Sequence, residues 1–191
     1  TNKYHQKMNI LSDRILSLEE SQTIAMARKS RELIDSGIDV ISLSLGEPDF
    51  NTPDFIKDAA KKAIDNNFSH YTPVPGLNSL RDAISGKFKR DNKLDYPADQ
   101  IVASTGAKQS LAQLLMAIVN PGDEIIVPAP YWVSYFQMVK MAEGTPVVIE
   151  ATVNADFKVT GEQVEQAITS KTKAFLFSTP CNPTGCLLYT S

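Results

Sequence analysis

The sequence contains little of what marks several large classes of protein. Its 191 residues include only two cysteines, which excludes a disulfide-dense fold. Its two histidines, His5 and His70, lie far apart in the sequence, and no cluster of His, Cys and acidic residues has metal-ligand spacing. The longest apolar stretch, residues 111–119, is interrupted by Gln113 and is far shorter than the ~20 apolar residues that span a membrane. No basic-then-apolar signal opens the chain. We therefore predict a soluble, cytoplasmic protein that has no metal site and no membrane partner.

An excess of charge of one sign is also missing. The chain has 19 Lys+Arg against 22 Asp+Glu, a formal net charge of −3. Without a cluster of basic residues there is no electrostatic surface for nucleic acid, so no nucleic-acid partner is expected. The hydrophobic content of 42% is typical of a globular domain with a real core.

What the sequence does contain is a regular alternation of strand-like and helix-like segments. Helical spacing of apolar residues predicts helices over residues 22–36, 77–88, 111–118, 135–142 and 162–168. A further helix is predicted with Thr52 as its N-cap and Pro53 as its first residue. Strands are predicted over residues 40–45, 101–103, 124–128, 146–150 and 173–178. Strands that alternate with helices indicate βαβ units around a mostly parallel sheet. The predicted fold class is therefore α/β.

Ligands of open α/β sheets bind beyond the carboxyl ends of the strands, and four unusual segments follow predicted strands. They are Gly46-Glu47-Pro48, Thr105-Gly106-Ala107-Lys108, Ala129-Pro130-Tyr131-Trp132 and Asn182-Pro183-Thr184-Gly185. Each has an ordinary interpretation when taken alone: a turn, a plain strand-to-helix connection, a core tryptophan. The lone glycine of the second segment excludes both a Rossmann fingerprint and a P-loop. Cys181 and Cys186 are too few to bind zinc.

Taken in order, these segments resemble the aspartate aminotransferase family, the fold-type I enzymes that use pyridoxal 5′-phosphate. The resemblance covers roughly residues 9–185, and its nearest subgroup is the bacterial-type enzymes related to aspartate/prephenate aminotransferases. The further motifs that carry it are Ser44-Leu45-Gly46-Glu47-Pro48-Asp49-Phe50, Tyr71-Thr72-Pro73-Val74-Pro75-Gly76, Gly106-Ala107-Lys108-Gln109, Pro121-Gly122-Asp123 and Pro130-Tyr131-Trp132-Val133-Ser134-Tyr135.

The resemblance implies a three-layer α/β fold with a mostly parallel sheet, truncated within the large domain. Residues 1–45 match a segment that belongs to the small domain, and residues 46–185 match the first half of the large cofactor-binding domain. Residues 186–191 do not resemble the family's continuation, so we predict that this tail is not native. The lysine that binds the cofactor covalently, the aspartate at its ring nitrogen and the arginine for the substrate α-carboxylate would all lie further on. No catalytic residue is therefore assigned within the chain.

The resemblance also implies how the cofactor is held. Gly106, Ala107 and Lys108 match a loop whose backbone N–H groups bind the cofactor phosphate. Trp132 matches an aromatic residue that stacks on the ring, and Asn182 matches an asparagine that donates to its phenolic oxygen. The cofactor itself takes up the electrons freed at the substrate Cα.

A second set of residues matches the family's contacts to the substrate and to the neighbouring subunit. Tyr71 matches a tyrosine that reaches the phosphate of the partner's cofactor, which implies a homodimer with shared active sites. Lys108 is predicted to meet the distal carboxylate of an acidic substrate, with hydroxyl groups from Ser21 and Thr23. The predicted substrate-binding residues are Gly46, Trp132, Asn182, Lys108, Ser21 and Thr23.

The predicted function is a fragment of an aminotransferase that acts on an amino acid, aspartate or glutamate in particular, and a 2-oxo acid. Three alternatives remain because fold and cofactor do not determine the reaction. They are an aromatic or broad-range aminotransferase, a β-lyase on the same fold, and a non-functional truncated product.

Overall fold

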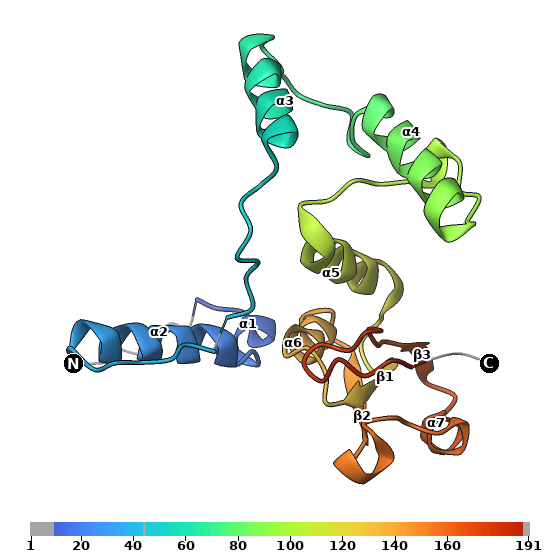
Figure 1. Cartoon of the computed structure of the whole chain (residues 1–191). Coiled ribbons are helices and arrows are strands. Elements are labelled where there is room, and N and C mark those ends of the chain that lie inside the picture. Colours follow the sequence, from blue (N-terminus) through green and yellow to red (C-terminus); the bar gives the residue numbers. More distant parts are fainter. Residues whose placement is uncertain (1–9, 44, 189–191) are drawn as a thin grey trace, which may run out of the picture. The chain divides into compact units, whose positions relative to one another are not determined.

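The computed structural model describes residues 10–43 and 45–188, and its helices and strands are labelled in Figure 1. The chain divides into two compact units. One joins residues 1–45 to residues 108–191, and the other is formed by residues 46–107. These two units are defined by contacts within the chain, and they do not test the domain boundaries that the resemblance implies. The division into residues 1–45, 46–185 and 186–191 stays a prediction.

The larger unit is built on a parallel sheet. Its strands are β1 (Glu124–Ala129), β2 (Thr145–Glu150) and β3 (Thr172–Phe175). They lie in the order β2-β1-β3, so β1 is central and both of its neighbours run parallel to it. The register pairs Ile126 with Val147 on one side and with Phe175 on the other. The α/β class with a parallel sheet is thus confirmed.

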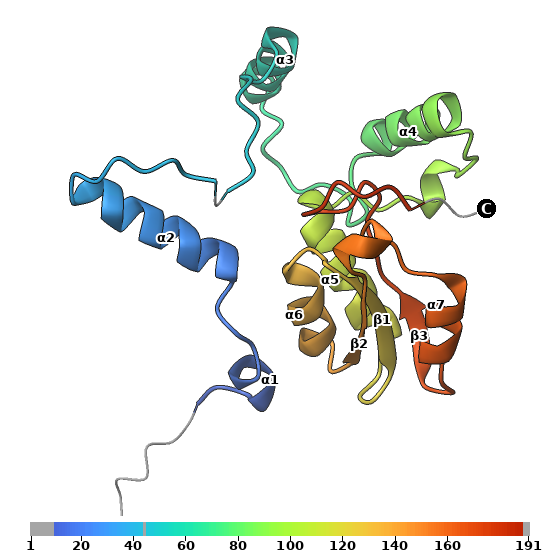
Figure 2. The same ribbon diagram turned by 60° about the horizontal axis from the view of Figure 1, so that its bottom comes forward.

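The middle of the central strand, residues 125–127, is apolar, whereas the strand begins at the charged Glu124. Ile125, Ile126 and Val127 are all fully buried, which is typical of a strand in a parallel sheet with helices on its faces. Two helices, α5 (Gly106–Ile118) and α6 (Ser134–Met141), contribute to the same core, as Figure 2 illustrates. The core cluster consists of Leu115, Val119, Ile125, Val127, Tyr135, Met138, Val139 and Ala142.

The connection from β2 to β3 passes through α7 (Gly161–Ala167). The helix begins with a capping box, in which Thr160 Oγ1 accepts from the Gln163 N–H while the Gln163 side chain accepts from the Thr160 N–H. Two orphan donors of the first turn are satisfied in this way. A short helix, α1 (Asp13–Leu16), and a longer one, α2 (Gln22–Asp35), precede the sheet in the sequence and belong to the same unit.

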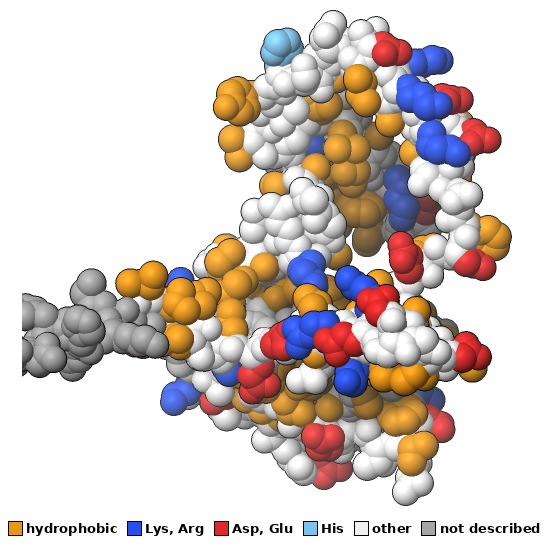
Figure 3. Space-filling view, turned by 90° about the vertical axis from the view of Figure 1, so that its left-hand side faces the viewer, with side chains coloured by type: hydrophobic (Ala, Val, Ile, Leu, Met, Phe, Trp, Pro, Cys, Tyr) orange, Lys and Arg blue, Asp and Glu red, His pale blue; other side chains and the backbone are white. Residues whose placement is uncertain are grey.

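The smaller unit, residues 46–107, is helical. It contains α3 (Asp54–Asp65), α4 (Asn78–Lys87), a π-helical turn at Phe88–Asn92 and a 3₁₀ turn at Ala98–Gln100. Arg81 ties α4 to the 3₁₀ turn by donating to the Ala98 carbonyl at 2.9 Å. Ile101 is the one hydrophobic residue of this unit that is buried. Hydrophobic side chains are visible on its surface in Figure 3.

Gly76 is a close-packed point in this unit. Its φ of +101° lies in the region that favours glycine, and a Cβ built there would stand 2.9 Å from the Ala103 Cβ. The Ala103 N–H donates to the Pro75 carbonyl at 2.9 Å. A glycine is therefore required where these two segments meet.

The predicted helices 22–36, 77–88, 111–118, 135–142 and 162–168 correspond to observed helices, as do the predicted strands 124–128 and 146–150 to observed strands. The predicted strand 173–178 is found but ends at Phe175. Two predictions of strands are wrong. Residues 40–43 and 101–103 are apolar but pair with no strand, and a strand exists only where a neighbour accepts its hydrogen bonds. Ser44, inside the first of these, lies outside the described residues.

The predicted start of α3 is displaced by one residue. Thr52 was expected to cap the helix and Pro53 to be its first residue, but Pro53 is the N-cap and no side chain caps the helix. The Pro53 carbonyl accepts from the Lys57 N–H at 3.2 Å. Proline is compatible with this position because it has no N–H that the helix would leave unpaired.

Candidate active site

The loops that follow β1 and β3 meet at the carboxyl edge of the sheet. The two strands are adjacent and parallel, so their carboxyl ends lie at the same edge. The Cys181 thiol donates to the Pro130 carbonyl at 3.3 Å and joins the two loops directly. This contact brings together the segment that carries Trp132 and the segment that carries Asn182.

Trp132 is positioned by the start of α6. Its carbonyl accepts from the Tyr135 N–H at 2.9 Å, and its ring meets the Tyr135 ring edge-on with centroids 5.5 Å apart. Tyr135 is buried in the core. The tryptophan is therefore attached through Tyr135 to the buried core of the unit, while part of the tryptophan's own surface stays accessible.

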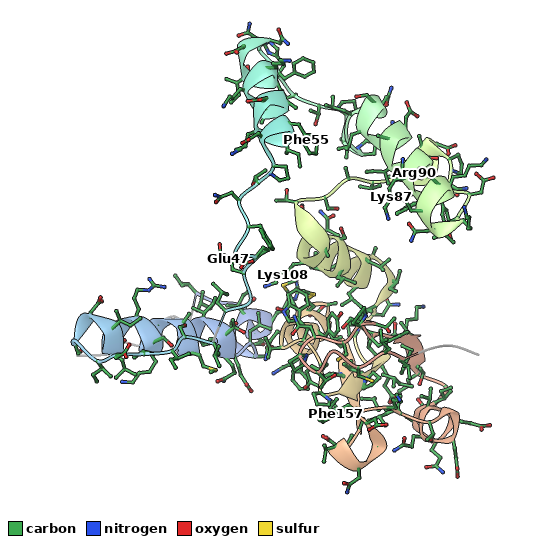
Figure 4. All side chains as sticks on the ribbon, viewed as in Figure 1. Glu47, Phe55, Lys87, Arg90, Lys108 and Phe157 are labelled. Carbon is green, nitrogen blue, oxygen red and sulfur yellow. The ribbon has the colours of Figure 1, made fainter. Side chains whose placement is uncertain are left out.

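Lys108 lies in the first turn of α5, where Figure 4 labels it, and its Nζ stands 4.9 Å from the centroid of the Trp132 ring. A cation at this distance from a tryptophan face is attracted by the ring quadrupole. The side chain of Lys108 is thus directed toward Trp132 rather than away from the unit. Lys108 is nevertheless exposed, so its role toward a substrate stays a prediction.

A cavity of about 530 Å³ adjoins this pair. Four of the sequence-predicted site residues line it together: Ser21, Thr23, Lys108 and Trp132. Its remaining lining residues are Leu18, Glu19, Glu20, Gln22, Ile24, Leu45, Ala112, Val133, Ser134, Gln137, Met138 and Met141. Residues more than eighty positions apart in the sequence therefore line one volume, and their predicted roles toward a substrate stay predictions.

Glu19, Glu20 and Lys108 carry the charges around this cavity. Lys108 is the one basic side chain among the residues that line it. Of the two acids, Glu20 is paired with the Arg28 guanidinium at 2.7 Å. Ser21 occupies the N-cap position of α2, yet its side chain makes no capping hydrogen bond. Its hydroxyl is not committed to the helix and can serve a ligand.

Gly106 and Ala107 begin α5 just before Lys108. Gly106 has a φ of +79°, and the space around its missing side chain is open. In the first turn of a helix the backbone N–H groups have no carbonyl within the helix to donate to, and the positive end of the helix dipole attracts an anion. Helix α5, with 13 residues, is long enough for this effect. The Gly106 N–H already donates to the Ser104 carbonyl at 2.8 Å, so the predicted contacts with a cofactor phosphate fall to the N–H groups of Ala107 and Lys108 and stay predictions.

Asn182 lies in a tight loop after β3. The Gly185 N–H donates to the Cys181 carbonyl at 2.7 Å, and the Cys181 N–H donates to the Cys186 carbonyl at 2.8 Å. The Asn182 N–H donates to the Ser178 hydroxyl at 3.3 Å. The backbone around Asn182 is therefore well held, while its side chain is exposed and remains a predicted donor to the cofactor.

Gly46 and Tyr71 belong to the smaller unit. Tyr71 is fully exposed and Gly46 has open space around it. Their predicted contacts with the substrate carboxylate and with the partner's cofactor stay predictions. So does the non-native origin of residues 186–191, of which residues 189–191 lie outside the described range.

The cavity is also lined by four residues of α6 that were not among the predicted site residues: Ser134, Gln137, Met138 and Met141. Their spacing of three or four residues places them on one face of the helix. That spacing was visible in the sequence, but it is equally typical of a helix that faces a hydrophobic core.

The burial of Tyr131, next to Trp132, raises the pKa of its phenol, and Glu150 raises it further. Tyr131 therefore stays protonated at neutral pH.

Within residues 10–43 and 45–188, no group of three or more His, Cys, Asp or Glu side chains could bind a metal ion. None of the helices described there is long and apolar enough to cross a membrane.

Comparisons with known proteins agree with the sequence motifs. The chain is 51% identical over 178 residues to the probable aspartate/prephenate aminotransferase of Rickettsia bellii, covering 93% of this chain and 45% of that protein. It is 53% identical over 178 residues to the aspartate/prephenate aminotransferase of Cereibacter sphaeroides, covering 93% and 44%. The chain thus spans a little under half the length of these relatives.

Solved structures show the same similarity. The aspartate aminotransferase of Thermus thermophilus with maleate matches with a TM-score of 0.91 and 41% identity, covering 94% of this chain and 47% of that one. The alanine aminotransferase of Pyrococcus furiosus matches with a TM-score of 0.87 and 35% identity, covering 93% and 46%. Residues 38–190 match the family described as aminotransferase class I and II, a match that runs through most of the tail predicted to be non-native and lends that prediction no support. The ordered motifs, the parallel sheet and this match together show that the chain belongs to the class I and II aminotransferases.

Proposed function

We propose that the protein carrying this chain transfers an amino group between an acidic amino acid, aspartate or glutamate, and a 2-oxo acid. The observation that carries the proposal is the cavity that Lys108 lines together with Ser21, Thr23 and Trp132. Its size of about 530 Å³ suits a small amino acid. The relatives named aspartate/prephenate aminotransferase, and the Thermus structure with the dicarboxylate maleate, support the same class of substrate.

In this proposal Lys108 binds the distal carboxylate of the substrate. Its ammonium group is a compact charge on a flexible stem, which suits acids of slightly different length. In the present structure the ammonium lies against the Trp132 ring, so a carboxylate would exchange a cation–π contact for an ion pair. The hydroxyl groups of Ser21 and Thr23 would donate to the remaining carboxylate lone pairs.

The proposed cofactor is pyridoxal 5′-phosphate, which when bound supplies an electron sink for the substrate Cα. The first turn of α5 would bind its phosphate through the N–H groups of Ala107 and Lys108. The Trp132 ring would stack on the cofactor ring, and Asn182 would donate a hydrogen bond to the ring oxygen. These four residues bind and orient the cofactor, and the homodimer implied by Tyr71 belongs to the same proposal.

A lysine substitution in the protein expressed from its complete gene tests the substrate assignment. A charge-assisted hydrogen bond contributes ~1.5–3 kcal/mol, so Lys108→Ala should lower kcat/KM for aspartate by about 10- to 150-fold. The loss for alanine should be much smaller, because alanine has no distal carboxylate. Equal losses for both substrates, or no loss, would remove this role from Lys108.

A second pair of substitutions tests the cofactor assignment in the same protein. Stacking contributes ~0.5–1.5 kcal/mol beyond the burial of area, so Trp132→Ala should weaken cofactor binding several-fold. Asn182→Ala should shift the pH profile of the cofactor's absorption, because the ring oxygen loses a donor. Unchanged affinity and spectra in both variants would contradict the proposed roles.

The apolar walls of the cavity favour one further candidate substrate. Leu18, Ile24, Met138 and Met141 line it together with the polar groups, and flexible methionine side chains adapt to guests of different shape. A 2-oxo acid with both a ring and a distal carboxylate, as the name aspartate/prephenate aminotransferase indicates for the relatives, would use both kinds of wall. Competition between such an acid and a short dicarboxylic oxo acid would test whether they share the site.

A further inference from the structure

The segment that leads into Ser21 and Thr23 is held along one side of α6. The Glu19 N–H donates to Gln137 Oε1 at 3.3 Å. One helical turn further along, Lys140 Nζ donates to the Ser17 carbonyl. In both contacts a side chain of α6 holds the backbone of the segment.

A third contact continues the same series. The Arg14 guanidinium lies 3.1 Å from the Glu143 carboxylate, just beyond the end of α6. On the side of α6 the three contacts come from residues 137, 140 and 143, which are spaced three apart. On the side of the segment they come from residues 19, 17 and 14, in that order. The segment therefore runs antiparallel to α6 in a continuous register.

Helix α6 is a firm support for such a segment. Val139 on its opposite side is fully buried, and Tyr135 and Met138 belong to the core cluster. The same helix begins directly after Trp132 and contributes Ser134 to the cavity. A segment attached to α6 is thus placed at a fixed distance from Trp132.

We propose that Gln137, Lys140 and Glu143 are positioning residues that hold residues 14–21 as a strap beside the cavity. By fixing the strap they place the hydroxyl groups of Ser21 and Thr23 next to Lys108, and so they set the preference for acidic substrates. This inference rests on the proposed function. In it Lys140 and Glu143 do not contact the substrate, whereas Gln137 also lines the cavity.

The contacts are individually weak, since all of them are exposed and exposed ion pairs contribute little. Their effect comes from acting in series on a short segment, which would otherwise be free to leave the cavity. A contact that only stabilised the fold would affect all substrates equally. A positioning contact affects the substrates that use Ser21 and Thr23.

The test uses the protein expressed from its complete gene, with the triple variant Gln137→Met, Lys140→Met and Glu143→Gln. We expect the KM for aspartate to rise about 5- to 20-fold, a range that follows from the loss of two or three exposed contacts. Because Gln137 also lines the cavity, basal activity is judged in the double variant Lys140→Met and Glu143→Gln, in which the kcat for aspartate and the kcat/KM for alanine should change less than about twofold. Lys158→Met is the matched control, because Lys158 makes an exposed ion pair with Asp156 at 3.7 Å away from the cavity, and it should leave both substrates unaffected.

Two further measurements separate positioning from general stability. Lys140→Met alone should raise the KM for aspartate, and Lys140→Arg should restore it because the guanidinium keeps a donor for the Ser17 carbonyl. Amide hydrogen exchange at Glu19 should accelerate in Gln137→Met. Unchanged exchange at Glu19, or equal losses for aspartate and alanine in the triple variant, would overturn the inference.

The outcomes also distinguish this inference from the proposed function. If the unmodified protein does not convert aspartate, or Lys108→Ala does not change its preference, the proposed function fails and the strap loses its role with it. If Lys108→Ala behaves as proposed while the triple variant is normal, only the strap is rejected.

Discussion

The sheet region of residues 108–188 and the helical region of residues 46–107 are stabilised in different ways. In the first, four side chains are almost completely excluded from solvent: Ile125, Ile126, Val127 and Val139. In the second, Ile101 alone is buried, while large side chains such as Phe55 and Ile64 are about three-quarters exposed. Both regions contain well-formed helices, so helix formation here does not report on the presence of a core.

The physical reason lies in the range of the hydrogen bonds. A helix satisfies its backbone within itself, so α3 and α4 form from local sequence alone. A strand must find a partner elsewhere in the chain, so β1 exists only because β2 and β3 lie on both sides of it. The sheet therefore forms together with a buried core, whereas the helices of the helical region form without one.

The largest expected effect is a complete loss of function: the well-packed sheet region is not sufficient for activity. The 191-residue chain alone should show no transamination above free pyridoxal phosphate, because the resemblance places the lysine that binds the cofactor covalently outside it. Keto-acid formation with added cofactor is the measurement. Turnover that is lost on heating and clearly exceeds the free cofactor would refute this prediction.

A matched pair of isoleucine substitutions should separate the two regions most clearly in stability. Ile125→Ala, in the centre of the sheet, should lower the free energy of unfolding by ~2–5 kcal/mol, through lost burial and the cavity that remains. Ile64→Ala, at an exposed position of α3, should change it by less than ~0.5 kcal/mol. Trp132 is the only tryptophan of the chain, so its fluorescence during urea unfolding reports the sheet region.

A comparable loss in both isoleucine variants would break the comparison. It would mean that Ile64 is covered in solution by something that the single chain does not show. Hydrogen exchange of the β1 amides provides the independent control for the Ile125 variant.

A pair of glycine substitutions should sharpen the description of the helical region. Gly76→Ala should destabilise it by ~1–3 kcal/mol, because the position has a positive φ and the new Cβ would meet Ala103. Gly86→Ala, inside α4 and in open space, should stabilise it by ~0.5–1 kcal/mol. Far-UV circular dichroism during urea unfolding measures both, and effects of the same sign would contradict the structure.

The smallest expected effect concerns the capping box of α7. Thr160→Ala should cost ~0.5–2 kcal/mol, since the Gln163 N–H loses its acceptor. Thr160→Ser keeps the hydroxyl and should restore most of the stability. If alanine and serine behave alike in urea unfolding, the cap contributes nothing measurable to the sheet region.

The sequence predicted the helices and the parallel βαβ pattern well, because their signals are periodic and local. It failed at residues 40–43 and 101–103, where an apolar run looks like a strand but no partner strand is found. It also placed the start of α3 one residue early, since Thr and Pro are both acceptable on either side of a helix start. These errors share a cause: a local pattern allows several structures, and distant contacts select one.

For the site, the sequence by itself determined the residue types and their order: a lysine in the first turn of α5, a tryptophan after β1 and an asparagine after β3. Only the tertiary structure decided that Lys108 lies against Trp132 and that Ser21 and Thr23 share their cavity. Only it revealed that α6 holds the strap, through contacts between residues 118 and 123 positions apart. Those two contacts are made to backbone groups of the strap, the Glu19 N–H and the Ser17 carbonyl, which every residue type except proline provides, and for that reason the strap's own sequence carries no trace of them.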